Sequence, residues 1–333
     1  MMITRRAARR LARRGARCGS SYLDARAARS SEVDSLVEIV EQANFEQRLG
    51  SGALTAAAGA PLSLEDAGID AATFDLALRA GFATLALHSE ARVASLLGHG
   101  FYTIGPCGEE LLAAVGLTLR ADDAMALHYR HLATQIARQL RDGRSMEEVL
   151  LDRARGYVVS ASDPVTGGAH CAVGGGASDF IVTSTLASQA PPAVGRALGN
   201  SVAHALNVPS ARFPKNFVSY VSLGDGSVNN GHFLSAANLA EYAKHRKYKC
   251  PVVFGVSDNN LCISLRGHDW LQTFAAQRLG GMETFACDGS NLLDVFRATK
   301  AATERARRRR EVSVRSRPLL PLHISCLRIL LTV

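Results

Sequence analysis

Two apolar runs, each ending in small polar residues, constrain this chain more than any other feature. They cover residues 217–223 and 251–257 and are typical of parallel strands buried on both faces. The polar clusters that follow them are Gly224-Asp225-Gly226 and Asn259-Asn260. Carboxyl ends of parallel strands lie side by side, so we expect a carboxylate and an amide oxygen to meet at one sheet edge. Such oxygens suit a divalent cation that holds a diphosphate.

The neighbouring segments predict the fold class. Strand-like runs and helix-like runs alternate along the second half of the chain; the strands are expected at 217–223, 251–257 and 283–287, and the helices at 186–206, 231–244 and 291–305. This order predicts an α/β protein with a doubly wound, mostly parallel sheet and flanking helices. In such sheets ligands bind beyond the carboxyl ends of the strands.

Charge is distributed unevenly along the 333 residues. Residues 1–30 contain nine Arg and one acid, residues 305–333 contain eight Arg and one Glu, and residues 31–304 contain 21 basic and 28 acidic side chains. An acidic body argues against binding nucleic acid, and no apolar run is long enough for a membrane span. The Arg-, Ala- and Ser-rich start predicts a mitochondrial transit segment and a matrix location; a basic tail or a nuclear signal is the alternative.

Three further groups are candidates for a site. Tyr129-Arg130 follows a strand-like run, where an Arg can clamp a phosphate or instead pair with Asp123 or Glu109. Backbone groups of residues 183–189 can grip a flat heterocycle above Leu186, whereas Ser184 or Thr185 can equally cap a helix. His170, on a Gly-rich loop, is a candidate proton shuttle or a surface residue with no role.

Together these motifs resemble the α subunit of a thiamine-diphosphate-dependent 2-oxo acid dehydrogenase, the E1 component, and most of all the branched-chain (2-oxoisovalerate) type. The similarity runs from about residue 101 to residue 305. The blocks that carry it are Phe101-Tyr102, Gly108-Glu109-Glu110, Tyr129-Arg130, Leu186-Ala187-Ser188-Gln189, Ala193-Val194-Gly195, Gly224-Asp225-Gly226, Asn259-Asn260, Asp288-Gly289 and Asp294-Val295-Phe296. The order of these blocks is more specific than any one of them.

The resemblance implies roles for individual residues. The residues it implies for the cofactor are Tyr129, Arg130, Ser184, Leu186, Gly224, Asp225, Gly226, Ser227 and Asn260. Mg²⁺ is implied to bind Asp225, Asn260 and the carbonyl oxygen of Cys262. Thr183, Ser188 and Gln189 are implied to bind a monovalent cation.

The resemblance also implies partners. A β subunit is expected to supply the Glu that activates the cofactor, in an α₂β₂ assembly that acts on a 2-oxo acid. The acyl product is expected to pass to the lipoyl arm of an E2 protein. A pyruvate or acetoin dehydrogenase α subunit is the alternative reading of the same motifs.

The resemblance divides the chain into four regions: a transit-like segment at 1–31, an N-terminal helical region at 32–98, a thiamine-diphosphate-binding α/β domain at 99–305 and a divergent tail at 306–333. Relatives are expected to carry a catalytic His loop after a strand like 319–328, and this chain lacks it. We therefore expect a truncated or frameshifted tail. The alternative is a catalytically incomplete partner with an assembly or regulatory role.

Overall fold

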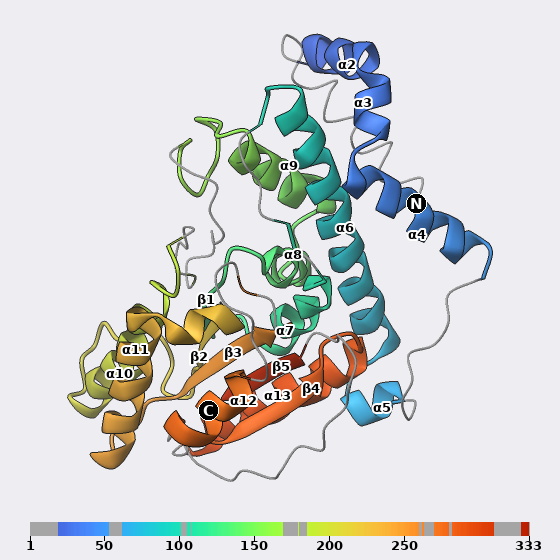
Figure 1. The fold of residues 1–333 in the computed structure, drawn as a ribbon. Helices are drawn as coiled ribbons and strands as arrows, with labels where there is room; N and C mark the ends of the chain where they lie inside the picture. Colours follow the sequence, from blue (N-terminus) through green and yellow to red (C-terminus); the bar gives the residue numbers. More distant parts are fainter. Residues whose placement is uncertain are drawn as a thin grey trace.

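The computed structural model describes residues 19–52, 62–100, 105–106, 108–168, 179, 185–259, 262, 270–279, 282–309 and 328–332. Figure 1 shows a sheet with helices on both sides and a group of N-terminal helices beside the long helix α6. The helices are α2 (Gly19–Ala28), α3 (Ser30–Asp34), α4 (Val37–Gly50), α5 (Leu64–Ala67), α6 (Ala71–Leu96), η1 (Glu110–Leu112), α7 (Ala113–Thr118), α8 (Leu132–Arg141), α9 (Met146–Tyr157), α10 (Ala190–Ala205), η2 (Asp225–Asn229), α11 (Gly231–His245), α12 (Trp270–Arg278) and α13 (Leu292–Arg309).

The sheet is mostly parallel, as the sequence predicts. Its strands are β1 (Ala124–Ala126), β2 (Ser219–Gly224), β3 (Val252–Asp258), β4 (Thr284–Asp288) and β5 (Arg328–Thr332). Their order is β1-β2-β3-β5-β4, with β1, β2 and β3 pairing in parallel. β5 pairs antiparallel with both β3 and β4. It lies in the tail at 306–333, where it begins at the last residue of the strand-like run expected at 319–328.

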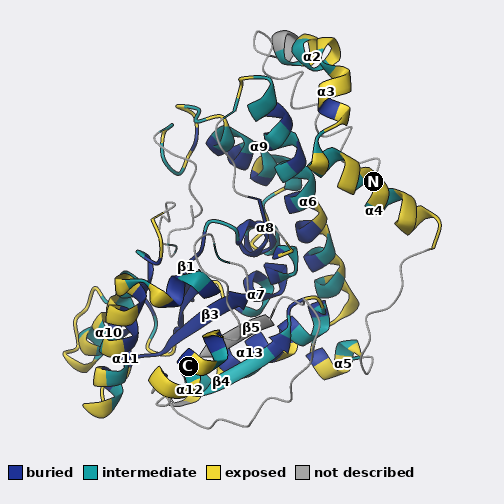
Figure 2. Ribbon diagram, viewed as in Figure 1, coloured by how far each residue is buried: buried dark blue, intermediate teal, exposed yellow. Residues whose placement is uncertain are grey.

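Alternate residues of β1, β2 and β3 enter two separate cores, which confirms the doubly wound class. Tyr220 and Val253 pack with α6, α7, α8 and α13 on one face. Val221 and Phe254 pack with α10, α11 and α12 on the other. Figure 2 shows the resulting pattern, with β1 and β3 buried and exposed outer faces on α10 and α11. A strand covered on both faces needs apolar residues at nearly every position, which explains the two runs in the sequence.

Two glycines lie where a neighbouring group leaves no room for a side chain. A Cβ on Gly116 of α7 would overlap the carbonyl oxygen of Thr134, because α7 and α8 cross there without a side chain between them. A Cβ on Gly255 of β3 would overlap the phenol of Tyr220, which is fully buried on the neighbouring strand. Both positions therefore require glycine for packing rather than for a positive φ.

Local signals set several helix starts. Ser145 and Glu148 form a reciprocal capping box at α9, and the Asp70 side chain accepts from Thr73 N at the start of α6. α10 differs from its expected bounds, because it begins at Ala190 rather than at 186. Its N-cap residue is Gln189, which makes no capping hydrogen bond, so the expected cap by Ser184 or Thr185 is not the start of this helix.

Among the described residues, no helix combines the length and apolar character needed to cross a bilayer.

Candidate functional site

The carboxyl ends of β2 and β3 lie side by side, as the sequence predicts. Gly224 pairs with Ser257 in the parallel register, so Asp225 and Asp258 sit at the same edge of the sheet. β1 lies on the other side of β2 and brings its own exit, at Tyr129 and Arg130, to this edge. Three connections therefore meet where ligands of doubly wound sheets collect.

Asp225 is the centre of this edge. It is the first residue of η2 and is 9% exposed. One carboxylate oxygen, Oδ1, accepts the Gly226 N–H at 2.8 Å and the Cys262 thiol at 3.6 Å. The other oxygen, Oδ2, is buried and has no hydrogen-bond partner within the described part of the chain. A buried carboxylate oxygen without a partner is unfavourable unless a cation satisfies it, so the residue present fits Mg²⁺.

Gly226 and Cys262 lie next to the Asp225 carboxylate. A Cβ added to Gly226 would lie 3.0 Å from the Cys262 Sγ, closer than an ordinary contact, so the Cys262 side chain would have to shift. Burial, and then the negative charge of Asp225, raises the pKa of the Cys262 thiol to about 11. The thiol is therefore protonated near neutral pH and acts as a donor to Asp225. Ser227 has a buried hydroxyl with no hydrogen-bond partner among the residues described, which leaves it available to a ligand.

The 3₁₀-helix η2 follows β2 directly. α11 begins at Gly231, where the sequence predicts it. The Asn230 side chain already accepts the His232 N–H at 2.8 Å. The backbone groups nearest Asp225 are therefore those of η2, of which the Gly226 N–H already donates to Asp225.

Tyr129 and Arg130 lie where the sequence predicts, in the turn after β1. The Arg130 guanidinium donates to the Gly105 carbonyl at 2.9 Å and lies 5.5 Å from the Tyr129 ring centroid. The sequence left Asp123 and Glu109 as alternative partners of Arg130. In the described structure Asp123 pairs with Arg307, and Glu109 contacts His131. The planar side chain is thus held half-buried at the ligand edge.

The segment before α10 lies over the same edge. The Gln189 side chain donates to the Ser222 carbonyl at 2.8 Å, next to the end of β2. Its amide oxygen is buried and lacks a partner among the described residues. Leu186 is 40% exposed, and its carbonyl oxygen lies 3.2 Å from His232 Nδ1. Ser188 donates to the Thr185 carbonyl at 3.0 Å.

Four residues expected in the site lie outside the described residues. They are His170, Thr183, Ser184 and Asn260.

Sequence reasoning missed a buried polar cluster at the same edge. Glu109, His128 and His131 place one ligand atom each within 4.8 Å of one another. His131 Nε2 also lies 3.2 Å from the Ser257 hydroxyl of β3. Burial, and then the proximity of His131, lowers the pKa of His128 well below its ordinary value. The available signal was the pair of His residues flanking Tyr129-Arg130, to which the sequence analysis assigned no role.

Comparison with known proteins identifies the family of this chain. Residues 98–314 match the family described as the dehydrogenase E1 component. The chain is 28% identical over 211 residues to 2-oxoisovalerate dehydrogenase subunit alpha of Bacillus subtilis (strain 168), covering 61% of this chain and 57% of that protein. It is 33% identical over 95 residues to pyruvate dehydrogenase E1 component subunit alpha of Staphylococcus aureus (strain N315), covering 28% and 24%.

A third relative is mitochondrial 2-oxoisovalerate dehydrogenase subunit alpha of Caenorhabditis elegans, which is 29% identical over 142 residues, or 42% of this chain and 28% of that protein. The fold and its polar edge define the class: an α/β protein with a mostly parallel sheet whose carboxyl edge carries buried polar residues. The chain belongs to the dehydrogenase E1 component family, which depends on thiamine diphosphate. Its matches span little more than half the length of the Bacillus relative and less of the other two.

Proposed function

We propose that this chain is the α subunit of a 2-oxo acid dehydrogenase E1 that binds thiamine diphosphate through Mg²⁺. The proposed reaction is the oxidative decarboxylation of a branched-chain 2-oxo acid, with transfer of the acyl group to a lipoyl-bearing E2. Family membership supports the cofactor class, and the Bacillus and Caenorhabditis relatives support the branched-chain substrate.

One observation carries the proposal. Asp225 presents a buried carboxylate oxygen without a described partner, at the edge where β2 and β3 pair in register. Asn260, two residues beyond β3, is proposed as a second oxygen ligand, with the Cys262 carbonyl as a third. Oxygen ligands of this kind match the preference of Mg²⁺.

The chain's own residues would bind and orient the cofactor. The Arg130 guanidinium offers a planar set of donors to a phosphate, with the adjacent Tyr129. Leu186 offers exposed apolar surface to the heterocycle, and Ser184 a backbone group. When bound, thiamine diphosphate supplies a nucleophilic carbon and an electron sink for decarboxylation. The Gln189 amide oxygen, with Ser188 and Thr183, is proposed to hold a monovalent cation.

The remaining catalytic groups are proposed to come from partners. A β subunit would supply the acid that activates the cofactor, in an α₂β₂ assembly, and E2 would accept the product. His170 is retained as the candidate proton shuttle on this chain. An α-like partner without activity of its own is the second candidate.

Calorimetry on the chain co-expressed with its β subunit tests the cofactor. We expect thiamine diphosphate to bind only with Mg²⁺, and Asp225→Asn to weaken binding at least about 100-fold, because removing one buried charged partner costs about 3 kcal/mol or more. Asp75→Asn is the matched control, since it removes one exposed carboxylate from α6. Equal binding by both variants would refute the proposed metal ligand.

Activity assays then separate the substrates. The same complex, supplied with lipoyl-bearing E2, is assayed with 2-oxoisovalerate, pyruvate and acetoin. Preference for 2-oxoisovalerate supports the proposal, and preference for either of the others replaces it with that dehydrogenase. Binding of the cofactor without turnover of any substrate would favour the non-catalytic partner.

The mitochondrial matrix is the proposed location. Helix α2 begins at Gly19 and is tied to α6 by an ion pair between Arg26 and Glu90, and Arg29 donates to the Leu96 carbonyl at 2.8 Å. Removal of a transit segment should therefore leave these contacts in place. These contacts favour a transit segment shorter than the 1–31 expected from the sequence. Intact-mass analysis of protein recovered from mitochondria should show a start before Tyr22, and a start beyond Arg29 would contradict the shorter segment.

A further inference from the structure

A buried cluster beside the proposed cofactor site contains ligands of a different chemistry. In the part of the chain that the structure describes, Glu109, His128 and His131 are the one group of three His, Cys, Asp or Glu side chains close enough to share an ion. Their exposed fractions are 4%, 4% and 1%. They come from the start of η1, the exit of β1 and the start of α8, so the fold rather than local sequence brings them together.

The polar atoms of this cluster are incompletely satisfied. His131 Nε2 and Glu109 Oε2 lie 2.7 Å apart, yet Oε2 has no hydrogen-bond partner of acceptable geometry among the described residues. His131 Nδ1 is likewise buried without a partner in the described structure. Among the ion pairs of the described residues, Glu109 is joined to His131 alone. A buried carboxylate in this position is stabilised by a cation that it shares with the imidazoles.

The donor set selects the kind of cation. Two imidazole nitrogens and one carboxylate suit zinc, whereas Mg²⁺ prefers oxygen ligands throughout. The set therefore differs from the oxygen ligands proposed around Asp225. Donors around a tetrahedral zinc lie about 3.3 Å apart, given bonds of about 2.0 Å. The contact of 2.7 Å must open slightly and the widest separation, up to 4.8 Å, must close, which small side-chain rotations achieve.

The surrounding residues hold this cluster in place. The His128 N–H donates to the Ser222 hydroxyl of β2 at 2.8 Å, and the Ser257 hydroxyl of β3 lies 3.2 Å from His131 Nε2. The first contact fixes the backbone of His128, and the second places the His131 ring beside β3. Tyr129 and Arg130 lie between the two His residues, so an ion here would fix the turn that carries them.

We propose that Glu109, His128 and His131 form a zinc site, separate from the magnesium site at Asp225, which fastens the turn bearing Tyr129 and Arg130 to the carboxyl edge of the sheet. Three protein ligands leave a fourth position for water. The role proposed for the ion is structural.

The test measures metal in the full chain, co-expressed with its β subunit in medium supplemented with Zn²⁺ or Co²⁺. We expect about one tightly held ion per chain, and for cobalt the intense visible absorption of tetrahedral coordination. His131→Asn and His128→Gln should each lower the retained metal at least about tenfold. Ser257→Ala should lower it less, because it removes an outer contact.

Two controls distinguish this site from others. His245→Asn removes an exposed imidazole from the end of α11, and Asp225→Asn removes the proposed magnesium ligand. Both variants should keep the zinc and the cobalt spectrum. Circular dichroism of each variant, before metal analysis, checks that it is folded. Absence of zinc and cobalt from the folded wild-type complex would overturn the proposal, as would full retention of metal in folded His131→Asn and His128→Gln.

Discussion

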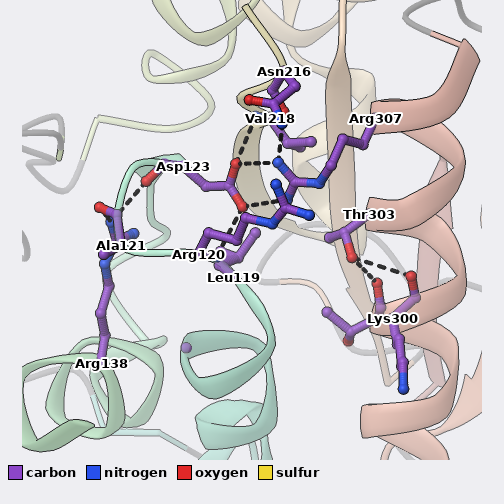
Figure 3. Close-up of polar contacts among 12 residues, drawn as sticks. Leu119, Arg120, Ala121, Asp123, Arg138, Asn216, Val218, Lys300, Thr303 and Arg307 are labelled. Atoms are coloured by element: carbon purple, nitrogen blue, oxygen red, sulfur yellow. Dashed lines mark hydrogen bonds and ion pairs between the residues drawn. The ribbon is translucent and has the colours of Figure 1, made fainter. Parts of the chain in front are cut away.

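Arg307, in the last turn of α13, forms a two-pronged ion pair with Asp123 at the start of β1 (Figure 3). The Asp123 carboxylate is fully buried and also accepts the backbone N–H groups of Arg120 and Val218, at 2.8 and 2.7 Å. Arg307 donates to the Asn216 carbonyl at 2.6 Å as well. This network joins the end of the last long helix to the amino edge of the sheet, opposite the proposed cofactor site.

Breaking this pair should destabilise the fold. Arg307→Met leaves a buried carboxylate without its cation, for which about 3–5 kcal/mol of unfolding free energy is the expected loss. Urea denaturation of the full chain measures it. Arg308→Met is the control, since its ion pair with Glu304 is exposed, and it should change stability by less than about 1 kcal/mol. If the two variants lost the same free energy of unfolding, the buried ion pair would contribute no more to stability than the exposed one.

The crossing of α7 and α8 depends on Gly116. Gly116→Ala should destabilise the chain by about 1–3 kcal/mol, because its Cβ would meet backbone atoms of α8 that cannot rotate away. Gly199→Ala is the matched control within α10, where a new Cβ meets nothing. That variant should be neutral or stabilised by up to about 1 kcal/mol. Thermal melting of both variants compares them, and a Gly116→Ala protein as stable as Gly199→Ala would contradict the close crossing.

The effect of Gly226 on cofactor binding should depend on its contact with Cys262. In the proposed cofactor site, Gly226→Ala brings a Cβ to 3.0 Å from the Cys262 Sγ and should weaken Mg²⁺-dependent thiamine diphosphate binding about tenfold or more. Adding Cys262→Ala to this variant should restore part of the affinity, because the crowded sulfur is gone. Calorimetry on the wild type, the two single variants and the double variant gives the coupling energy between Gly226 and Cys262 for cofactor binding. Additive losses would show that the two residues act independently.

Cys250 should make stability depend on alkaline pH. Burial raises the pKa of its thiol from 9.0 to about 12. The unfolded chain therefore loses this proton at a lower pH than the folded chain does. The contribution to stability is complete below pH 9 and declines as pH rises through the interval from 9 to 12. Cys250→Ala should show a flatter decline of melting temperature over this interval.

Alkylation provides a second measurement on the same thiol. At pH 9, iodoacetamide should leave Cys250 unmodified in the folded protein and modify it in urea, as mapped by peptide mass spectrometry. Rapid modification of the folded chain would contradict its burial.

Several elements were predictable because their signals are local. The buried strands β2 and β3 follow from uninterrupted apolar runs, and the meeting of Gly224 with Ser257 follows from parallel pairing. The positions of Asp225, Tyr129 and Arg130 at one edge of the sheet follow from where β2 and β1 end. α10 was placed four residues too early, because the small residues before Ala190 satisfy a helical pattern without forming a helix.

The amino-acid sequence by itself determined the strand and helix order, the sheet edge that carries Asp225, and the family. Tertiary structure alone decided which distant residues touch: Glu109 with His131, Asp123 with Arg307, and β5 inserted antiparallel between β3 and β4. Periodicity and turn residues act over a few positions along the chain, so they specify elements. Contacts across 22 or 184 residues depend on how those elements pack, and no local pattern records that.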